Sequence, residues 1–266
     1  MWWKLILLGS IMIRTFRVFT LADIAPASAA DTTRRIEGAR LRGVLRGAPA
    51  LLQKRISTLA DLLRDERISV NRTQAARWDL SLTGTWPSRP VTVAAGRPPR
   101  IRVLVNVWFL RTSGWLVVFE AARPLAEAVA YIIGGTLTHD LRAVTALTPD
   151  PGQWKQLFKW AQHDKAEQGG VLGGKFYKTS AGGADFEWLS MRLSAGSSRR
   201  LLGEAFGEAE GVGELLLATP RLSGLADSIT CRVSRGGVFR IYASEVSDSV
   251  VESLLVELAR LWAPAP

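Results

Sequence analysis

The chain has 266 residues, of which 47% are hydrophobic and 22% are charged. This composition is typical of globular proteins, so it excludes wholesale disorder and allows one large domain or two ordinary ones. The formal net charge is +10, which favours a polyanionic partner such as nucleic acid or an anionic membrane surface.

The excess of positive charge comes from arginine. Seven of the 34 basic residues are lysine, which leaves 27 arginines. Because Ala, Gly and Leu are also abundant, a coding bias toward arginine explains the same composition. Net charge reports on non-specific attraction and does not locate a site, so both explanations stay open.

Cys231 is the only cysteine, which excludes an intramolecular disulfide and a zinc site built from several cysteines. It lies within an apolar strand pattern, so we expect a buried structural thiol. This cysteine usage is compatible with a reducing compartment, and we expect a cytoplasmic protein.

The start of the chain partly resembles a secretory signal. Lys4 precedes an apolar run, and small residues at positions 25–30 offer a cleavage site. Arg14 and Arg17 interrupt this pattern, so a competing interpretation makes Arg14–Ala22 the first strand. We assign residues 1–13 to a non-native start or a weak signal-like segment. No apolar run reaches the ~18 residues that a transmembrane helix needs.

Two helices are expected next. Asp31 is placed to cap a helix that begins at Thr32 and carries Arg35, Arg42 and Arg46 as a stripe beside its apolar face. This stripe is either a phosphate-contacting surface or an ordinary solvated face. A second helix over 50–65 follows from its apolar spacing.

The centre of the chain indicates a hairpin followed by a helix. Strands are expected over 73–82, 101–110 and 115–121, with a proline- and glycine-rich loop over 84–100. The strand over 101–110 is apolar enough to be covered on both faces. Gly114 suits the turn, Pro124 suits the first turn of the helix, and Gly134-Gly135 is expected to end it.

The second half predicts a similar order of elements. Asp150 and Gln153 form a capping signature for a helix that reaches Gln162. The glycine-rich stretch 169–185 lacks the hydroxyl of a nucleotide-binding loop after Lys175, so we expect a hairpin linker. The remaining elements are a short strand over 144–147, a strand over 186–193, a short helix from 197 or 198, a strand over 213–219, a hairpin over 229–243 and a last helix capped by Ser249 and Glu252.

Few residues indicate catalysis. The dyads His139-Asp140 and His163-Asp164, with Glu167, could bind a metal only if the fold brought them together. We find no local metal motif, nucleophile elbow or dinucleotide fingerprint. We therefore expect neither a catalytic residue nor a cofactor nor a bound metal, with an enzyme at the two dyads as an open alternative.

Together these patterns predict an α+β fold. Its antiparallel sheets are built from repeated β-hairpin–helix units, with an N-terminal helical pair, an N-terminal half over 14–149 and a C-terminal half over 150–266. We expect a basic, non-enzymatic, nucleic-acid-associated protein, with DNA the favoured ligand and a homo-oligomer left open. The expected phosphate-contacting residues are Arg35, Arg42, Arg46, Arg72, Arg111, Arg235 and Arg240.

The rival hypothesis is a small-molecule binder. A long C-terminal helix on a curved antiparallel sheet can enclose an apolar cavity. Its expected lining is Trp108, Phe119, Phe239 and Trp262.

Overall fold

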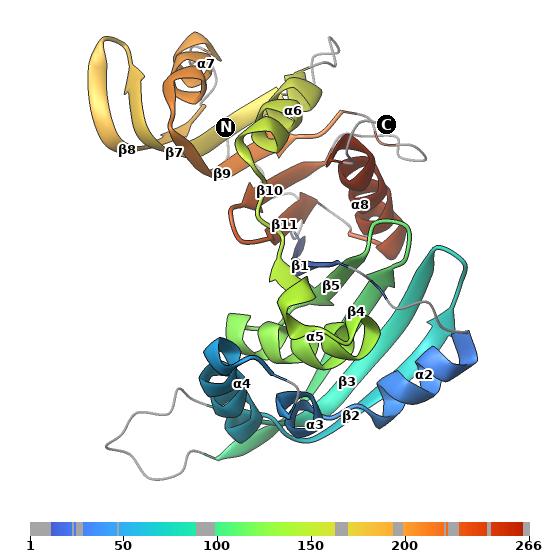
Figure 1. Cartoon of the computed structure of the whole chain (residues 1–266). Coiled ribbons are helices and arrows are strands. Elements are labelled where there is room, and N and C mark those ends of the chain that lie inside the picture. Colours follow the sequence, from blue (N-terminus) through green and yellow to red (C-terminus); the bar gives the residue numbers. More distant parts are fainter. Residues whose placement is uncertain are drawn as a thin grey trace. The chain divides into compact units, whose positions relative to one another are not determined.

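The computed structural model describes residues 12–22, 24, 29–46, 48–88, 99–162, 170–193, 199–220, 222, 229–243 and 246–262 (Figure 1). The signal-like residues 1–11 lie outside this set. The chain divides into an N-terminal unit, Phe16–Leu147, and a C-terminal unit, which contains everything from Thr148 together with the residues up to Thr15. Strand β1 (Met12–Leu21) crosses this boundary.

The N-terminal unit is an antiparallel sheet with helices on one face. Its strand order is β2-β3-β4-β5-β1-β6, and every pairing in it is antiparallel. The strands are β2 (Arg64–Thr73), β3 (Arg77–Pro87), β4 (Arg100–Leu110), β5 (Trp115–Phe119) and β6 (Val144–Ala146). The helices are α2 (Ala29–Gly38), α3 (Leu41–Leu45), α4 (Ala50–Leu62) and α5 (Arg123–Thr138), with a 3₁₀ turn at Leu141–Ala143.

Side chains alternate between the two faces of the strands, and those on one face form the apolar core of this unit. Leu80, Leu82, Val105 and Val107 point to the face on which α5 packs, and all four are buried. Ile132 of α5 belongs to the same apolar cluster. Burying this surface supplies the main stabilisation of the unit, since apolar burial contributes about 25 cal/mol per Å².

The C-terminal unit has the strand order β8-β7-β9-β10-β11, again antiparallel throughout. Phe176, Leu215 and Phe239 are fully buried in it, and Phe158 stacks on Phe206 at 4.1 Å. Its strands are β7 (Gly170–Ala181), β8 (Ala184–Arg192), β9 (Gly211–Ala218), β10 (Thr230–Ser234) and β11 (Val238–Ala243). Its helices are α6 (Pro151–Gln162), α7 (Arg199–Glu208) and α8 (Asp248–Trp262).

The protein therefore has a mixed α+β fold. The predicted N-terminal helical pair is not confirmed, because three helices, α2, α3 and α4, follow the first strand β1. The prediction of a single helix from Thr32 onward is wrong, since α2 ends at Gly38 and α3 begins at Leu41. Within the described residues, no helix combines the length and the apolar character needed to cross a bilayer.

Three local predictions are corrected. Helix α5 does not stop at Gly134-Gly135 but continues to Thr138, because these glycines let Val144 and Leu141 pack against the helix. Strand β4 is covered on both faces only over 107–110, where consecutive residues are buried, and its first half has an exposed face. The stretch over 169–185 forms a hairpin as expected but is not a linker, since from Gly170 it forms β7, the turn and the start of β8.

Two other changes concern strand and helix limits. The polar strand β2 was not expected, and β3 begins four residues after the predicted strand start at Thr73. The last helix is capped by Ser247, whose hydroxyl accepts from the Val250 N–H, and not by Ser249.

Candidate functional site

The face of the N-terminal sheet opposite α5 carries a group of arginines. Arg67 pairs with Thr83 and Arg72 with Asp79 across β2 and β3, and Thr85 of β3 pairs with both Arg64 and Arg102. Because paired residues point to the same side of a sheet, these arginines share one face. We call Arg64, Arg67, Arg72 and Arg102, which are all exposed, the N-terminal arginine face.

This face has a surplus of positive charge. None of its four arginines forms an ion pair with a carboxylate in the described part of the chain. One nearby carboxylate, Asp79, is already held by Arg77, with 2.8 Å between Arg77 Nε and Asp79 Oδ1. Another, Asp65, accepts a hydrogen bond from the Thr85 hydroxyl at 3.4 Å.

The arginine face is hollowed where Arg67 and Arg102 lie. A cavity of about 740 Å³ opens there, and its lining includes Asp65, Thr83 and Leu104. Standard strand spacings put the Arg67 and Arg102 Cα atoms about 12 Å apart across this hollow. Arginine side chains on either side can therefore reach one anion or two neighbouring anions within it.

A further arginine reinforces the positive potential of this edge. Arg100 donates hydrogen bonds to the Thr85 carbonyl at 2.8 Å and to the Leu62 carbonyl. Burial lowers the pKa of Arg100, and the charge of Arg64 lowers it further. The nearby Asp65 carboxylate acts in the opposite direction and raises the pKa of Arg100.

The predicted helical stripe of arginines does not form. Arg35 lies on α2, where it donates to the Thr136 carbonyl at 3.1 Å and contacts the ring of His139 at the end of α5. Arg42 lies on α3, 4.0 Å from Asp61, and Arg46 follows that helix in an exposed turn. The predicted stripe does not form because α2 ends at Gly38 and α3 begins only at Leu41, so the three arginines lie on different elements.

The other predicted arginines belong to sheets and turns. Arg72 is part of the arginine face. Arg111 lies in the turn after β4, 5.8 Å over the ring of Trp78, and bonds the Ala75 carbonyl at 3.4 Å. Arg235 and Arg240 lie in the C-terminal unit, in the β10–β11 turn and on β11.

Aromatic side chains lie on the C-terminal sheet among basic residues. Tyr177 of β7 pairs with Trp188 of β8, and these side chains are 46% and 65% exposed. Lys175, two residues before Tyr177, is also exposed and pairs with Glu214 of β9. Phe176 points to the opposite, buried face.

Sequence reasoning missed six residues of these two faces. Arg64, Arg67 and Arg102 were not singled out, because β2 is too polar to predict as a strand and β4 was expected to be covered on both faces. Lys175, Tyr177 and Trp188 were missed because the glycine-rich stretch was taken for a linker. The signal was present as two aromatic-containing runs on either side of Gly182-Gly183, which is typical of a hairpin.

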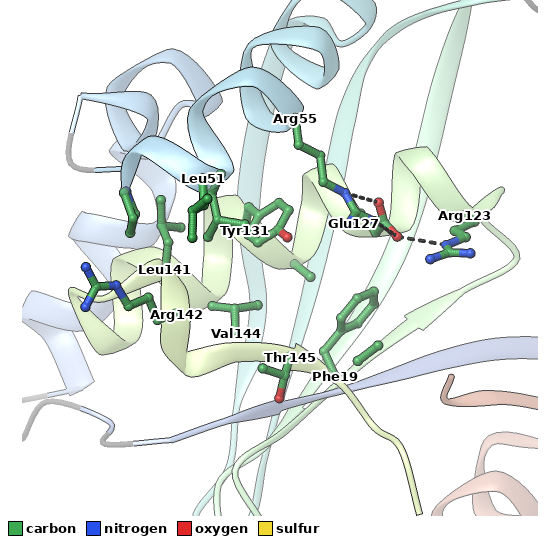
Figure 2. Close-up of a pocket in the computed structure, with 14 residues that line it drawn as sticks. Phe19, Leu51, Arg55, Arg123, Glu127, Tyr131, Leu141, Arg142, Val144 and Thr145 are labelled. Atoms are coloured by element: carbon green, nitrogen blue, oxygen red, sulfur yellow. Dashed lines mark hydrogen bonds and ion pairs between the residues drawn. The ribbon is translucent and has the colours of Figure 1, made fainter. Parts of the chain in front are cut away.

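A pocket of about 470 Å³ lies in the N-terminal unit between α4, α5 and the segment containing β6. Figure 2 shows apolar side chains across its middle, with Arg142 at one end. At the other end Arg55 holds Glu127 with two contacts of 2.6 and 3.2 Å, and Arg123 Nε lies 2.9 Å from the same carboxylate. Two cations on one carboxylate leave that end positive.

The pocket combines an exposed leucine with a buried tyrosine. Leu51 on α4 is 95% exposed at its rim, and Tyr131 of α5 is 9% exposed in its wall. Burial raises the pKa of Tyr131, so its hydroxyl stays protonated and able to donate near neutral pH. Within the described residues the hydroxyl has no hydrogen-bond partner.

The lining expected for the rival hypothesis is different. Trp108 and Phe119 contact each other at 4.7 Å in the N-terminal unit, while Phe239 and Trp262 lie 6.5 Å apart in the C-terminal unit. None of them lines the pocket in Figure 2.

The histidine dyads give no metal centre among the residues described. His139 ends α5 in a left-handed conformation, and Asp140 caps the following 3₁₀ turn through its bond from the Arg142 N–H. His163, Asp164 and Glu167 lie outside the described residues. In the part of the chain that is described, no group of three or more histidine, cysteine or acidic side chains could hold a metal ion.

No protein-family model matches the sequence, and no curated protein is significantly similar to it.

Proposed function

We propose that this is a non-enzymatic, nucleic-acid-associated protein that contacts phosphates through arginines. The single observation that carries the proposal is the N-terminal arginine face, where four exposed arginines share one side of a sheet and form no ion pair with a carboxylate of the described residues. Arginine forks match phosphate oxygens, and such contacts supply most of the sequence-independent affinity for DNA.

The proposal differs in one respect from the sequence-based hypothesis. The main phosphate contacts come from Arg64, Arg67, Arg72 and Arg102, with Arg235 and Arg240 on the other unit. Arg35 and Arg111 contribute less, because their guanidinium groups are engaged with carbonyls and rings of the fold itself.

An internal repeat is part of this proposal. The order hairpin then helix occurs as β4–β5–α5, β7–β8–α7 and β10–β11–α8. A repeated unit of this kind would present a sheet face to a ligand while its helix fills the core behind.

The test is the salt dependence of DNA binding. With four phosphate contacts from the N-terminal arginine face alone, the slope of log K against log salt should be about −3.6 or steeper, an affinity loss of at least about 150-fold between 50 and 200 mM salt. The double variant Arg67→Gln/Arg102→Gln should reduce the slope by about 1.8. Fluorescence anisotropy with a labelled 20-base-pair duplex measures both.

A matched variant separates a site from a net-charge effect. Arg200 and Arg260 are more than four-fifths exposed, on α7 and α8, and Arg200→Gln/Arg260→Gln removes the same charge. That variant should retain the parent slope. The proposal would be contradicted if the parent and both double variants had equal salt slopes, or if the two double variants reduced the slope equally.

The pocket in Figure 2 favours a second candidate function, the binding of a small amphipathic anion. Its volume is that of ordinary ligand pockets, its middle is apolar, and its ends carry arginines. The Tyr131 hydroxyl adds a donor in the wall. A fatty carboxylate or aromatic sulfonate fits this chemistry.

Fluorescence of anilinonaphthalene sulfonate tests this candidate. Leu51→Asp should abolish the enhancement, because it places a charge at the apolar rim. The control Val256→Asp alters an exposed apolar residue of α8 and should retain it. If both variants behave alike, the dye reports exposed apolar surface and the pocket has no such function.

A further inference from the structure

The exposed aromatic pair on the C-terminal sheet is the feature that deepens the proposed function. Tyr177 and Trp188 are direct cross-strand partners on β7 and β8. A tryptophan that is 65% exposed leaves a large apolar ring in water, although aromatic side chains usually bury most of their surface. The next cross-strand pair on this face, Lys175 and Ser190, is polar.

The Tyr177 ring packs directly over a glycine, Gly213. A Cβ atom added at Gly213 would lie 2.7 to 3.1 Å from three atoms of the Tyr177 side chain, so the ring lies directly over this residue. Gly213 is the extra residue where the β7–β9 register shifts. Behind the ring, fully buried Phe176 packs against Phe206 at 6.2 Å and holds β7 in place.

Basic residues lie near this pair, although Glu214 and the ion pair between Lys178 and Glu210 lie near it as well. Lys175 lies on the same side of β7 as Tyr177, and the Arg235 N–H donates to the Gly213 carbonyl at 2.8 Å, which brings the β10–β11 turn next to the ring. Arg240 lies directly opposite Arg232 on the same sheet face. Glu214 forms an ion pair with Arg232 at 3.4 Å, whereas Arg240 has no ion pair with a carboxylate among the residues that the structure describes.

Two exposed rings among cations fit nucleic acid better than a protein partner. A stable protein interface buries about 800 Å² per partner with an apolar centre, and here the neighbours of the rings include Lys175 and Ser190. A base needs only the face of a ring and a nearby cation for its phosphate. Stacking also requires an unpaired base, because a base inside a duplex is covered on both faces.

We propose that Tyr177 and Trp188 form a stacking platform for unpaired bases, so that the nucleic acid recognised is single-stranded or has an unpaired segment. This inference rests on the proposed function. Within the C-terminal unit, Lys175, Arg235 and Arg240 would contact the backbone phosphates, and the two rings would hold the bases.

The experiment compares dT20 with a 20-base-pair duplex on the full chain by fluorescence anisotropy. Trp188→Ala should weaken binding of dT20 by between about 5-fold and about 100-fold and leave duplex binding unchanged. Trp188→Phe, which keeps an aromatic ring, should restore most of the affinity. Val256→Ala removes exposed apolar surface from α8 and should change neither.

Ultraviolet cross-linking of a 5-iodouracil-labelled strand gives a second readout, with the cross-linked peptide expected to contain Tyr177 or Trp188. If the parent and Trp188→Ala bind dT20 equally, with a salt-dependent affinity, the platform is refuted while the proposed function stands. If neither oligonucleotide binds, the proposed function fails, and the platform with it. Binding of a peptide or a sugar that requires Trp188, without dT20 binding, would also overturn the inference.

Discussion

Adding a single methyl group at Gly213 should move the Tyr177 ring while the fold stays intact. The new Cβ of Gly213→Ala would lie 2.7 Å from Tyr177 Cε2 and 2.9 Å from the hydroxyl oxygen. Contacts this short are not tolerated, so one side must move. We expect the Tyr177 side chain to move and the backbone to stay, because the side chain is nearly half exposed and can rotate toward solvent.

The expected magnitudes for Gly213→Ala differ between stability and binding. Alanine in a strand is favoured over glycine by about 0.5–1 kcal/mol, which offsets the cost of moving an exposed side chain. The melting temperature should therefore change by only a few degrees. Stacking of one base is worth about 1–3 kcal/mol, so the affinity for dT20 should fall between about 5-fold and about 100-fold.

Gly211→Ala is the matched control, because it makes the same change two residues earlier on the same strand. Its Cβ would lie 3.9 Å from Tyr177 Cδ2, an ordinary contact, so the ring stays where it is. The two variants are compared by thermal denaturation and by dT20 anisotropy. Equal affinities for both would refute the argument that the position of the Tyr177 ring matters for binding.

Three further predictions concern stability. Burial raises the pKa of the Cys231 thiol from 9.0 to about 12, so the buried thiol stabilises the folded state fully below pH 9, and this stabilisation is lost as the pH rises toward 12. By pH 10.5 the free energy of unfolding in urea should have fallen by about 2 kcal/mol more for the parent than for Cys231→Ala, and an equal pH dependence of the two proteins would contradict this. Asp150→Ala removes the acceptor of the Gln153 N–H at 2.8 Å and should cost about 1 kcal/mol, measured in the same way. Glu66→Ala leaves the Leu41 N–H without its buried acceptor and should cost about 1–3 kcal/mol, whereas exposed Glu208→Ala should cost almost nothing.

Elements with a strong local signal were predictable from the sequence. Helix α6 has a capping box, in which Asp150 and Gln153 each accept from the other's N–H, and its expected core residues are buried. The turn before β5 needs a positive φ, and Gly114 has one of 65°. Cys231 is buried in β10 as expected. In each case a few neighbouring residues determine the local conformation.

Elements that depend on distant contacts were not predictable. Gly134 and Gly135 normally indicate a helix end, but here their missing side chains make room for Val144 and Leu141, which come later in the chain. Strand β2 reads as a polar segment, and only its pairing with β3 makes it a strand. No local pattern contains that information.

The candidate site was harder to predict than the fold, because it depends on register. Arg64 and Arg102 are 38 positions apart, and they share a face only because both pair with Thr85. A helical stripe is visible in a sequence at its spacing of three and four residues, which is why Arg35, Arg42 and Arg46 drew attention first. A sheet face becomes visible only when the strand pairing is known.

The same register bears on the choice between a coding bias toward arginine and the proposed binding surface. A general bias would spread the charge surplus evenly, but the six arginines of β2, β3 and β4 all project to the face opposite α5, where Asp65 and Asp79 are the acidic residues. Six arginines less two aspartates give +4 on one face of three strands, out of a net +10 for the whole chain. Self-repulsion of this size lowers stability, so a polyanion that binds the face gains affinity by relieving it. This uneven distribution supports the proposed polyanion-binding surface, and the salt dependence of DNA binding is its test.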